Sequence, residues 1–306
     1  MSLIDKINKY WKKIALSALV ITSLSINPYS STKQDETISQ EQKEKYALIY
    51  SADTYKDGFI DSTWVGGGTK NTYLISTANI YESLKKQGYK DENITIVYFD
   101  GKADYNETKD STLIKKFEEE KGEEIKAEKS GKKNLKSKLD LLSKKASLED
   151  EVLIYITGHG YKNYVSNEFH FELPTTNENL PGYYEKISPT ELTSLIDQIP
   201  AKNKTVVLDF CYSGKFGSEL YKQGINTFTA TDSTTVSMNS RDSQFGRGLI
   251  NAKINKEADT DKNGAITWEE AFDYSEEQRL PILKQHKAAG HYHKLEMVPG
   301  QKYITK

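Results

Sequence analysis

A cysteine and a histidine mark the candidate chemistry in this chain. Cys211 is the only cysteine among 306 residues, and it directly follows an apolar run, Thr205 to Phe210. His159 closely follows a second apolar run, Val152 to Ile156. Nucleophilic catalysis by cysteine needs an imidazole within reach to accept the thiol proton. The two residues are therefore candidates for a nucleophile and its general base.

The elements around this pair explain how distant residues meet. Both runs have the length and the β-branched and aromatic content of buried strands, and parallel strands place their carboxyl ends at one edge of a sheet. Between them, Ser188 and Glu191 form a capping box around a proline, which predicts a helix that Pro200 ends. We therefore predict a strand–helix–strand unit that carries His159 and Cys211 on the same edge.

Two short motifs carry a family resemblance. They are Gly158-His159-Gly160 and Asp209-Phe210-Cys211-Tyr212-Ser213-Gly214, and the stretch from Asn71 to Glu107 supports them. In this order and at strand ends, they resemble the caspase-hemoglobinase group of cysteine peptidases, and within it the legumain family. The resemblance covers residues 46 to 250. It implies an α/β fold with a mostly parallel sheet flanked by helices.

The resemblance also implies roles for single residues. Cys211 would be the nucleophile and His159 the general base. The backbone N–H groups of Gly160 and Cys211 would form the oxyanion hole, where each donor contributes about 3 kcal/mol to catalysis. Asn71, placed by the resemblance just before an early helix, would orient the histidine.

The chain departs from the legumain pattern where the substrate binds. The resemblance places an arginine two residues after Asn71, but Tyr73 stands there, and Tyr212 replaces the acidic residue that follows the cysteine. A tyrosine hydroxyl cannot make a bidentate contact, so we expect poor cleavage after Asn and Asp. Asp209 is similar to an acidic pocket residue of metacaspases, which favours Arg or Lys before the scissile bond.

The segment 259–270 matches the calcium loop of an EF-hand at every constrained position. Oxygen ligands alternate along it, Gly264 makes the turn at the sixth position, and Ile266 supplies the apolar anchor. A calcium ion is the expected cofactor, in a structural role, because the chain has one such loop. The predicted ligands are Asp259, Asp261, Asn263, the Ala265 carbonyl, Thr267 and Glu270.

The amino-terminal sequence suggests where the protein acts. A lysine-rich stretch precedes thirteen mostly apolar residues, 14–26, which is a signal-peptide pattern. We assign 1–26 to a signal peptide or an uncleaved signal anchor, 27–45 to a polar linker and 46–306 to the peptidase domain. The protein is thus expected to be secreted or extracytoplasmic, with a membrane attachment only if the segment stays uncleaved. A net charge of −2 argues against a nucleic-acid partner.

These observations predict an exported cysteine endopeptidase that acts on peptides or proteins through Cys211 and His159. A transpeptidase using the same residues is one alternative, because an amine can replace water in the second step. A catalytically silent, calcium-stabilised binding module is another. The reactivity of the thiol separates the silent module from the enzymes.

Overall fold

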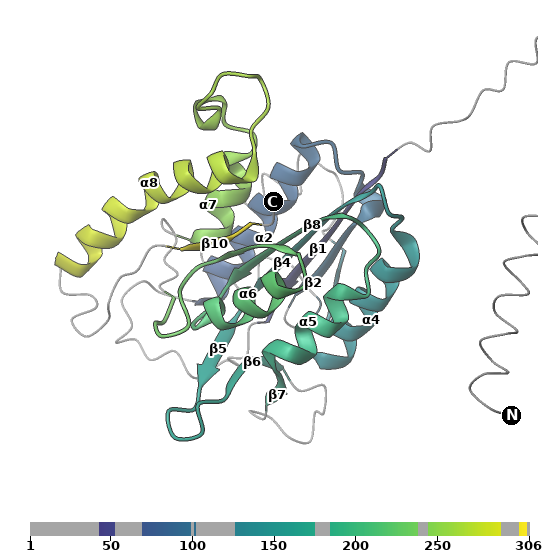
Figure 1. The fold of residues 1–306 in the computed structure, drawn as a ribbon, viewed down its shortest axis with the longest axis vertical. Coiled ribbons are helices and arrows are strands. Elements are labelled where there is room, and N and C mark those ends of the chain that lie inside the picture. Colours follow the sequence, from purple (N-terminus) through teal and green to yellow (C-terminus); the bar gives the residue numbers. More distant parts are fainter. Residues whose placement is uncertain are drawn as a thin grey trace, which may run out of the picture. The chain divides into compact units, whose positions relative to one another are not determined.

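A seven-stranded sheet forms the centre of the fold (Figure 1). The computed structural model describes residues 43–52, 69–98, 101, 126–174, 184–237, 244–288 and 300–304. The strand order is β10-β9-β8-β4-β1-β2-β3, and every neighbouring pair is parallel except β9 with β10. The strands are β1 Lys45–Ser51, β2 Ile94–Tyr98, β3 Ala127–Glu128, β4 Glu151–Thr157, β8 Asn203–Asp209, β9 Asn226–Thr229 and β10 Gln301–Tyr303.

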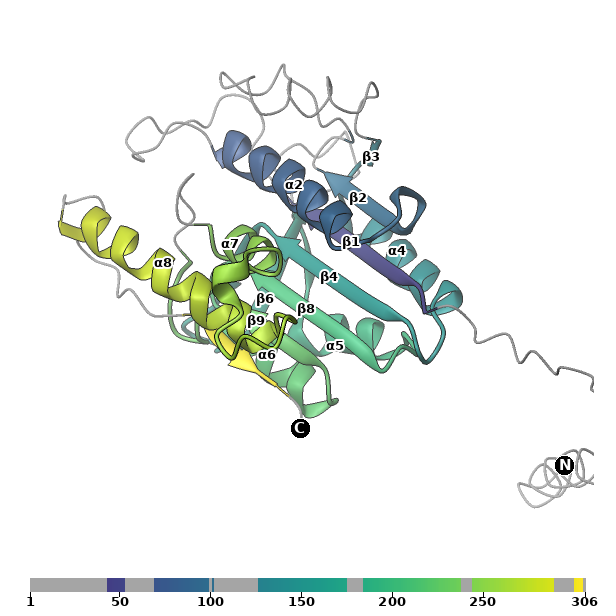
Figure 2. The same cartoon turned by 90° about the horizontal axis from the view of Figure 1, so that it is seen from above.

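Among the described residues, six α-helices cover the two faces of this sheet (Figure 2). On one face lie α2 Thr69–Lys86, α7 Phe245–Ala252 and α8 Trp268–Ala288; on the other lie α4 Lys132–Lys145, α5 Pro189–Asp197 and α6 Ser213–Lys222. Two short 3₁₀ helices, η1 Asp91–Asn93 and η3 Lys256–Ala258, lie in connections. The α/β class and the mostly parallel sheet predicted from the sequence are confirmed.

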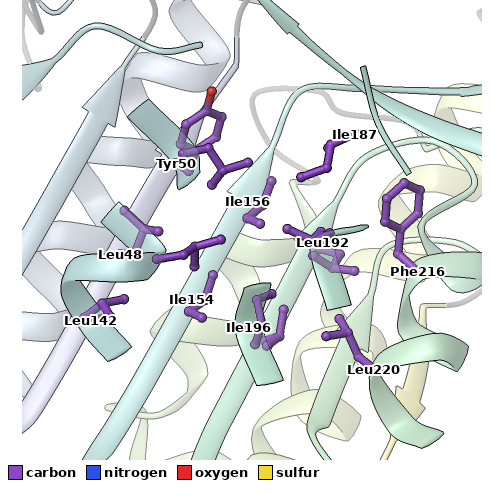
Figure 3. Close-up of a cluster of buried hydrophobic side chains, with 14 of the residues drawn as sticks. Leu48, Tyr50, Leu142, Ile154, Ile156, Ile187, Leu192, Ile196, Phe216 and Leu220 are labelled. Atoms are coloured by element: carbon purple, nitrogen blue, oxygen red, sulfur yellow. The ribbon is translucent and has the colours of Figure 1, made fainter. Parts of the chain in front are cut away.

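Cover on both faces explains why the central strands are apolar throughout rather than alternating. In β4, Leu153 and Tyr155 face α2, α7 and α8, whereas Ile154 and Ile156 face α4, α5 and α6. Figure 3 shows the second of these clusters, where Ile154 and Ile156 pack with Leu192 of α5. Full burial of an aliphatic side chain contributes about 1.5–3 kcal/mol, so these strands are held firmly in register.

The connection from β4 to α5 contains more than the sequence analysis predicted. The helix begins as expected, with the Ser188 hydroxyl accepting a hydrogen bond from the Glu191 N–H at 3.1 Å. Before it, however, the chain forms a separate three-stranded antiparallel sheet, β5 His159–Lys162, β6 Phe169–Pro174 and β7 Tyr184–Ile187 (Figure 1). The simple strand–helix–strand unit is thus corrected. His159 ends no strand; it begins one.

The first strand, β1, shows where the described fold begins along the sequence. β1 begins at Lys45, which the sequence analysis had assigned to the linker. The signal segment 1–26 and the linker up to residue 42 lie outside the described residues. No helix in the described part of the chain combines the length and the apolar character needed to cross a membrane.

Candidate active site

The carboxyl ends of β4 and β8 bring the predicted pair to the same edge of the sheet. The two strands are parallel neighbours, and their last paired residues are Thr157 and Asp209. The Thr157 hydroxyl also donates a hydrogen bond to the Asp209 carbonyl at 3.0 Å. His159 comes two residues after Thr157, and Cys211 comes two residues after Asp209. The edge of the sheet therefore positions both residues.

Two glycines permit the close approach at this edge. Gly158 has a φ of +152°, and a Cβ there would lie 2.6 Å from the Ala52 carbonyl oxygen. A Cβ on Gly160 would lie only 1.9 Å from the Cys211 carbonyl oxygen. Glycine is therefore required at residue 160, because the backbone beside the histidine runs directly against the backbone of the cysteine.

The His159 side chain is surrounded mainly by other protein groups. Its ring meets the Tyr73 ring edge-on, with the centroids 6.4 Å apart. Burial lowers the pKa of His159 from 6.5 to about 4, because an imidazolium would lose hydration there. The imidazole is therefore neutral at physiological pH and available to accept a proton.

The cysteine ends a strand and precedes a sharp turn. Tyr212 adopts a left-handed conformation, with φ 60° and ψ 20°, and α6 starts at the next residue. The Ser237 N–H donates to Cys211 Sγ at 3.3 Å, and the thiol faces the Ser237 carbonyl at 3.8 Å. Burial raises the pKa of Cys211 from 9.0 to about 11, so the resting group is a thiol.

This arrangement is suited to proton transfer followed by nucleophilic attack. A neutral thiol and a neutral imidazole lie at one sheet edge, and both residues are half-buried. Loss of the thiol proton to the imidazole would create a thiolate next to the Ser237 N–H donor. Their partial burial strengthens the electrostatic interactions that would form during a reaction.

The predicted substrate contacts have different environments. Tyr73 is buried, at 4% exposure, against His159 rather than open to a ligand. Asp209 is also fully buried, and its Oδ2 accepts hydrogen bonds from the Gly246 N–H at 2.9 Å and from the Tyr155 hydroxyl at 3.4 Å. In this state both side chains face the protein interior, and their contact with a substrate stays a prediction.

Tyr212 connects the nucleophile turn to the hairpin between β5 and β6. Its hydroxyl lies 2.7 Å from that of Tyr164, a hairpin residue that is 72% exposed. This hairpin is absent from the elements predicted from the sequence. Its signals were present, since Asn163 and Asn167 are turn residues between runs of apolar and polar alternation. The hairpin places aromatic side chains beside the predicted active site.

Asn71, the predicted orienting residue, belongs to the first turn of α2 rather than to the segment before it. Its side chain lies outside the described residues, so its role remains a prediction. Tyr73, two residues later, places the start of this helix beside His159.

The predicted calcium loop brings three carboxylates together. One ligand oxygen from each of Asp259, Asp261 and Glu270 lies within 4.8 Å of the others. Asp259 accepts hydrogen bonds from the N–H groups of Asn263 and Gly264, at 3.2 and 2.9 Å. Gly264 makes the turn with a φ of +87°. The donor set is all oxygen, as a hard cation requires.

Glu270 closes this loop from the start of α8. Its two carboxylate oxygens accept from the N–H groups of Thr260 and Thr267, at 3.0 and 2.9 Å. The hydrogen bonds, above all that from the Thr267 N–H, lower the pKa of Glu270 to about 2. Its charge is therefore retained at physiological pH, as metal ligation needs. The helix that follows the loop, α8, continues to Ala288.

Comparison with known proteins identifies a family for this chain. The model of the peptidase C13 family matches residues 64–298, which is more than half of the chain and includes both candidate catalytic residues. No match to the chain is found among the curated proteins.

Proposed function

The chain belongs to the peptidase C13 family of legumain-like cysteine peptidases, and on that premise we propose that it is an exported endopeptidase with Cys211 as nucleophile and His159 as general base. The observation that carries the proposal is the contact between Gly160 and the Cys211 backbone at the ends of two paired strands. This contact fixes the histidine-bearing and cysteine-bearing segments against each other.

The proposed reaction is acyl transfer to sulfur. The imidazole of His159 takes the thiol proton, and the thiolate attacks the peptide carbonyl carbon. The N–H groups of Gly160 and Cys211 stabilise the oxyanion, and the imidazolium then gives its proton to the leaving amine. Water resolves the thioester in hydrolysis. An amine resolves it in transpeptidation, which uses the same residues.

A single experiment separates this enzyme from a silent binding module. Because Cys211 is the only cysteine, any label from a thiol-reactive peptide probe reports on it alone. We expect rapid labelling at neutral pH that His159→Gln slows strongly, together with peptide cleavage that Cys211→Ala lowers by several orders of magnitude. Slow labelling that His159→Gln leaves unchanged, without peptide cleavage, would instead support the silent module.

Calcium is the proposed structural cofactor of this enzyme. The support is the preformed loop in which Asp259, Asp261 and Glu270 converge. The Asn263 side chain, the Ala265 carbonyl and Thr267 would complete an oxygen shell. The ion would fix the connection between α7 and α8, and so it would stabilise the folded state by mass action. Calcium titration of the wild type and of a Glu270 variant tests this role.

Export is proposed from the amino-terminal pattern alone. A cleaved signal peptide would release the enzyme, and an uncleaved anchor would hold it at a membrane. Expression of the full chain in its host, followed by fractionation and amino-terminal sequencing of the product, distinguishes these forms. A product that keeps residue 1 and stays in the cytoplasmic fraction would contradict export.

A further inference from the structure

The second sheet has two chemically different faces. Directly opposed residues of antiparallel strands place their side chains on the same face. The registers of β5, β6 and β7 align His159 with Glu172 and Glu172 with Lys186. Their neighbours Phe171 and Ile187, on the other face, are fully buried in the core. A polar row thus runs across the sheet from the candidate general base.

Glu172 is the acidic member of this row and lies next to His159. Opposed Cβ atoms are about 4.5–5.5 Å apart in such pairs. The Glu172 side chain is 23% exposed, and its Oε1 lies 3.7 Å from His170 Nε2. Burial raises the pKa of Glu172, whereas it lowers the pKa of His170. A neutral imidazole is thus the near partner of a partly desolvated carboxylate.

The remaining cation of the row does not neutralise Glu172. Lys186 is exposed and lowers the pKa of Glu172 only as a secondary influence, after burial. Within the described residues no ion pair joins the two side chains. A partly buried carboxylate with weak compensation gains most from a new cationic partner, because the Coulomb attraction then offsets the lost hydration.

The position of the row identifies the part of the substrate that it meets. In the proposed reaction His159 protonates the leaving amine, so the peptide that leaves must extend past His159. We propose that Glu172 is a specificity-determining residue that favours Lys or Arg as the first residue after the scissile bond. This inference rests on the proposed function, and it concerns the leaving side of the substrate, not the acyl side.

Matched peptides that differ only in the first residue after the scissile bond test the proposal. With Lys, norleucine and Glu there, we expect the wild type to favour Lys over norleucine by about tenfold in kcat/KM. Glu172→Gln should bring that ratio near one, and Glu172→Lys should improve cleavage of the Glu peptide. Glu168→Gln, on the same hairpin, should leave the preference unchanged.

Binding provides a second measurement that needs no turnover. The Cys211→Ala protein should bind the Lys peptide more tightly than the norleucine peptide, and adding Glu172→Gln should remove the difference. A gain for the Glu peptide in Glu172→Lys cannot arise from misfolding. Equal cleavage and binding of the Lys and norleucine peptides by the proteins with Glu172 would overturn the inference. Equal cleavage of both peptides by the wild type would still leave the proposed function standing, whereas an absence of cleavage of every peptide would refute the peptidase itself.

Discussion

Thr157 and Asp209 lie opposite each other at the ends of β4 and β8, and the Thr157 hydroxyl donates to the Asp209 carbonyl at 3.0 Å. This hydrogen bond joins the ends of two neighbouring parallel strands, so the two segments that follow leave the sheet side by side. One segment carries His159 and the other carries Cys211. The candidate dyad therefore depends on strand register, which buried side chains on both faces of the sheet maintain.

The contact between Gly160 and Cys211 predicts a severe effect of one methyl group. Gly160→Ala should abolish cleavage and lower the free energy of unfolding by at least about 1–3 kcal/mol. The reason is that the new Cβ would meet backbone atoms that cannot move independently. Gly248→Ala in α7 is the matched control, since its Cβ would meet nothing closer than Ser275 Cβ at 3.7 Å. That change should be neutral or stabilise the helix. Urea unfolding and peptide cleavage measure both variants, and normal activity in Gly160→Ala would contradict the proposed geometry.

The neutral dyad predicts how stability depends on pH. The pKa of His159 falls from 6.5 in the unfolded chain to about 4 in the folded one. Only the unfolded state binds this proton between those values, so stability should decrease as pH falls from 6.5 toward 4, by up to about 1.4 kcal/mol per pH unit. His159→Gln should remove this component. Urea unfolding of both proteins across that range checks it, and equal slopes would count against a buried neutral imidazole.

The thiol predicts a second transition at high pH. Burial raises the pKa of Cys211 from 9.0 to about 11, so the unfolded chain loses this proton first. Stability should therefore fall as pH rises from 9.0 toward 11, and Cys211→Ala should lack that component. The difference between the two proteins in unfolding free energy is the quantity to measure. A difference that does not change with pH would show that the folded state leaves the thiol well hydrated.

Calcium should stabilise the wild type through its loop. A free calcium concentration one hundred times the dissociation constant would add about 2.7 kcal/mol to the free energy of unfolding. Glu270→Gln should weaken binding because it removes the charge of the ligand that closes the loop. Glu269→Gln changes the adjacent carboxylate, outside the predicted ligand set, and should bind normally. Isothermal calorimetry and thermal unfolding with and without calcium check this, and an absence of binding at millimolar calcium would exclude the site.

Asp209 is expected to affect stability as well as specificity. Asp209→Asn weakens the hydrogen bond from the Gly246 N–H in a fully buried site, which should cost about 1–3 kcal/mol. Asp140→Asn, in an exposed pair with Lys144, should change stability by less than about 1 kcal/mol. If substrate binding exposes Asp209, the variant should also lose a preference for Arg or Lys before the scissile bond.

Matched peptides with Asn, Asp, Arg, Lys or Leu before the scissile bond test that preference in both proteins. The buried Tyr73 stands where the family resemblance places an arginine, so Asn and Asp should be poor substrates. A clear preference for Asn in kcat/KM would show that another residue takes the place of that arginine.

The amino-acid sequence by itself determined the features that depend on neighbouring residues. The apolar runs before His159 and Cys211 predicted β4 and β8, because strands buried on both faces need such runs. The capping box at Ser188 predicted the start of α5, since its hydrogen bond spans only three residues. The calcium loop was predicted for the same reason, as its proposed ligands follow one another along a short segment.

Only the tertiary structure decided which distant groups lie together. The alignment of Thr157 with Asp209, the position of Glu172 opposite His159, and the burial of Asp209 all depend on strand pairing and on packing between separate elements. The hairpin signal in 163–167 was local, but its place beside Tyr212 was not. A strand shifted by one residue would reverse the face of each side chain, and the cores on both faces of the sheet, built from many segments, select the register that forms this site.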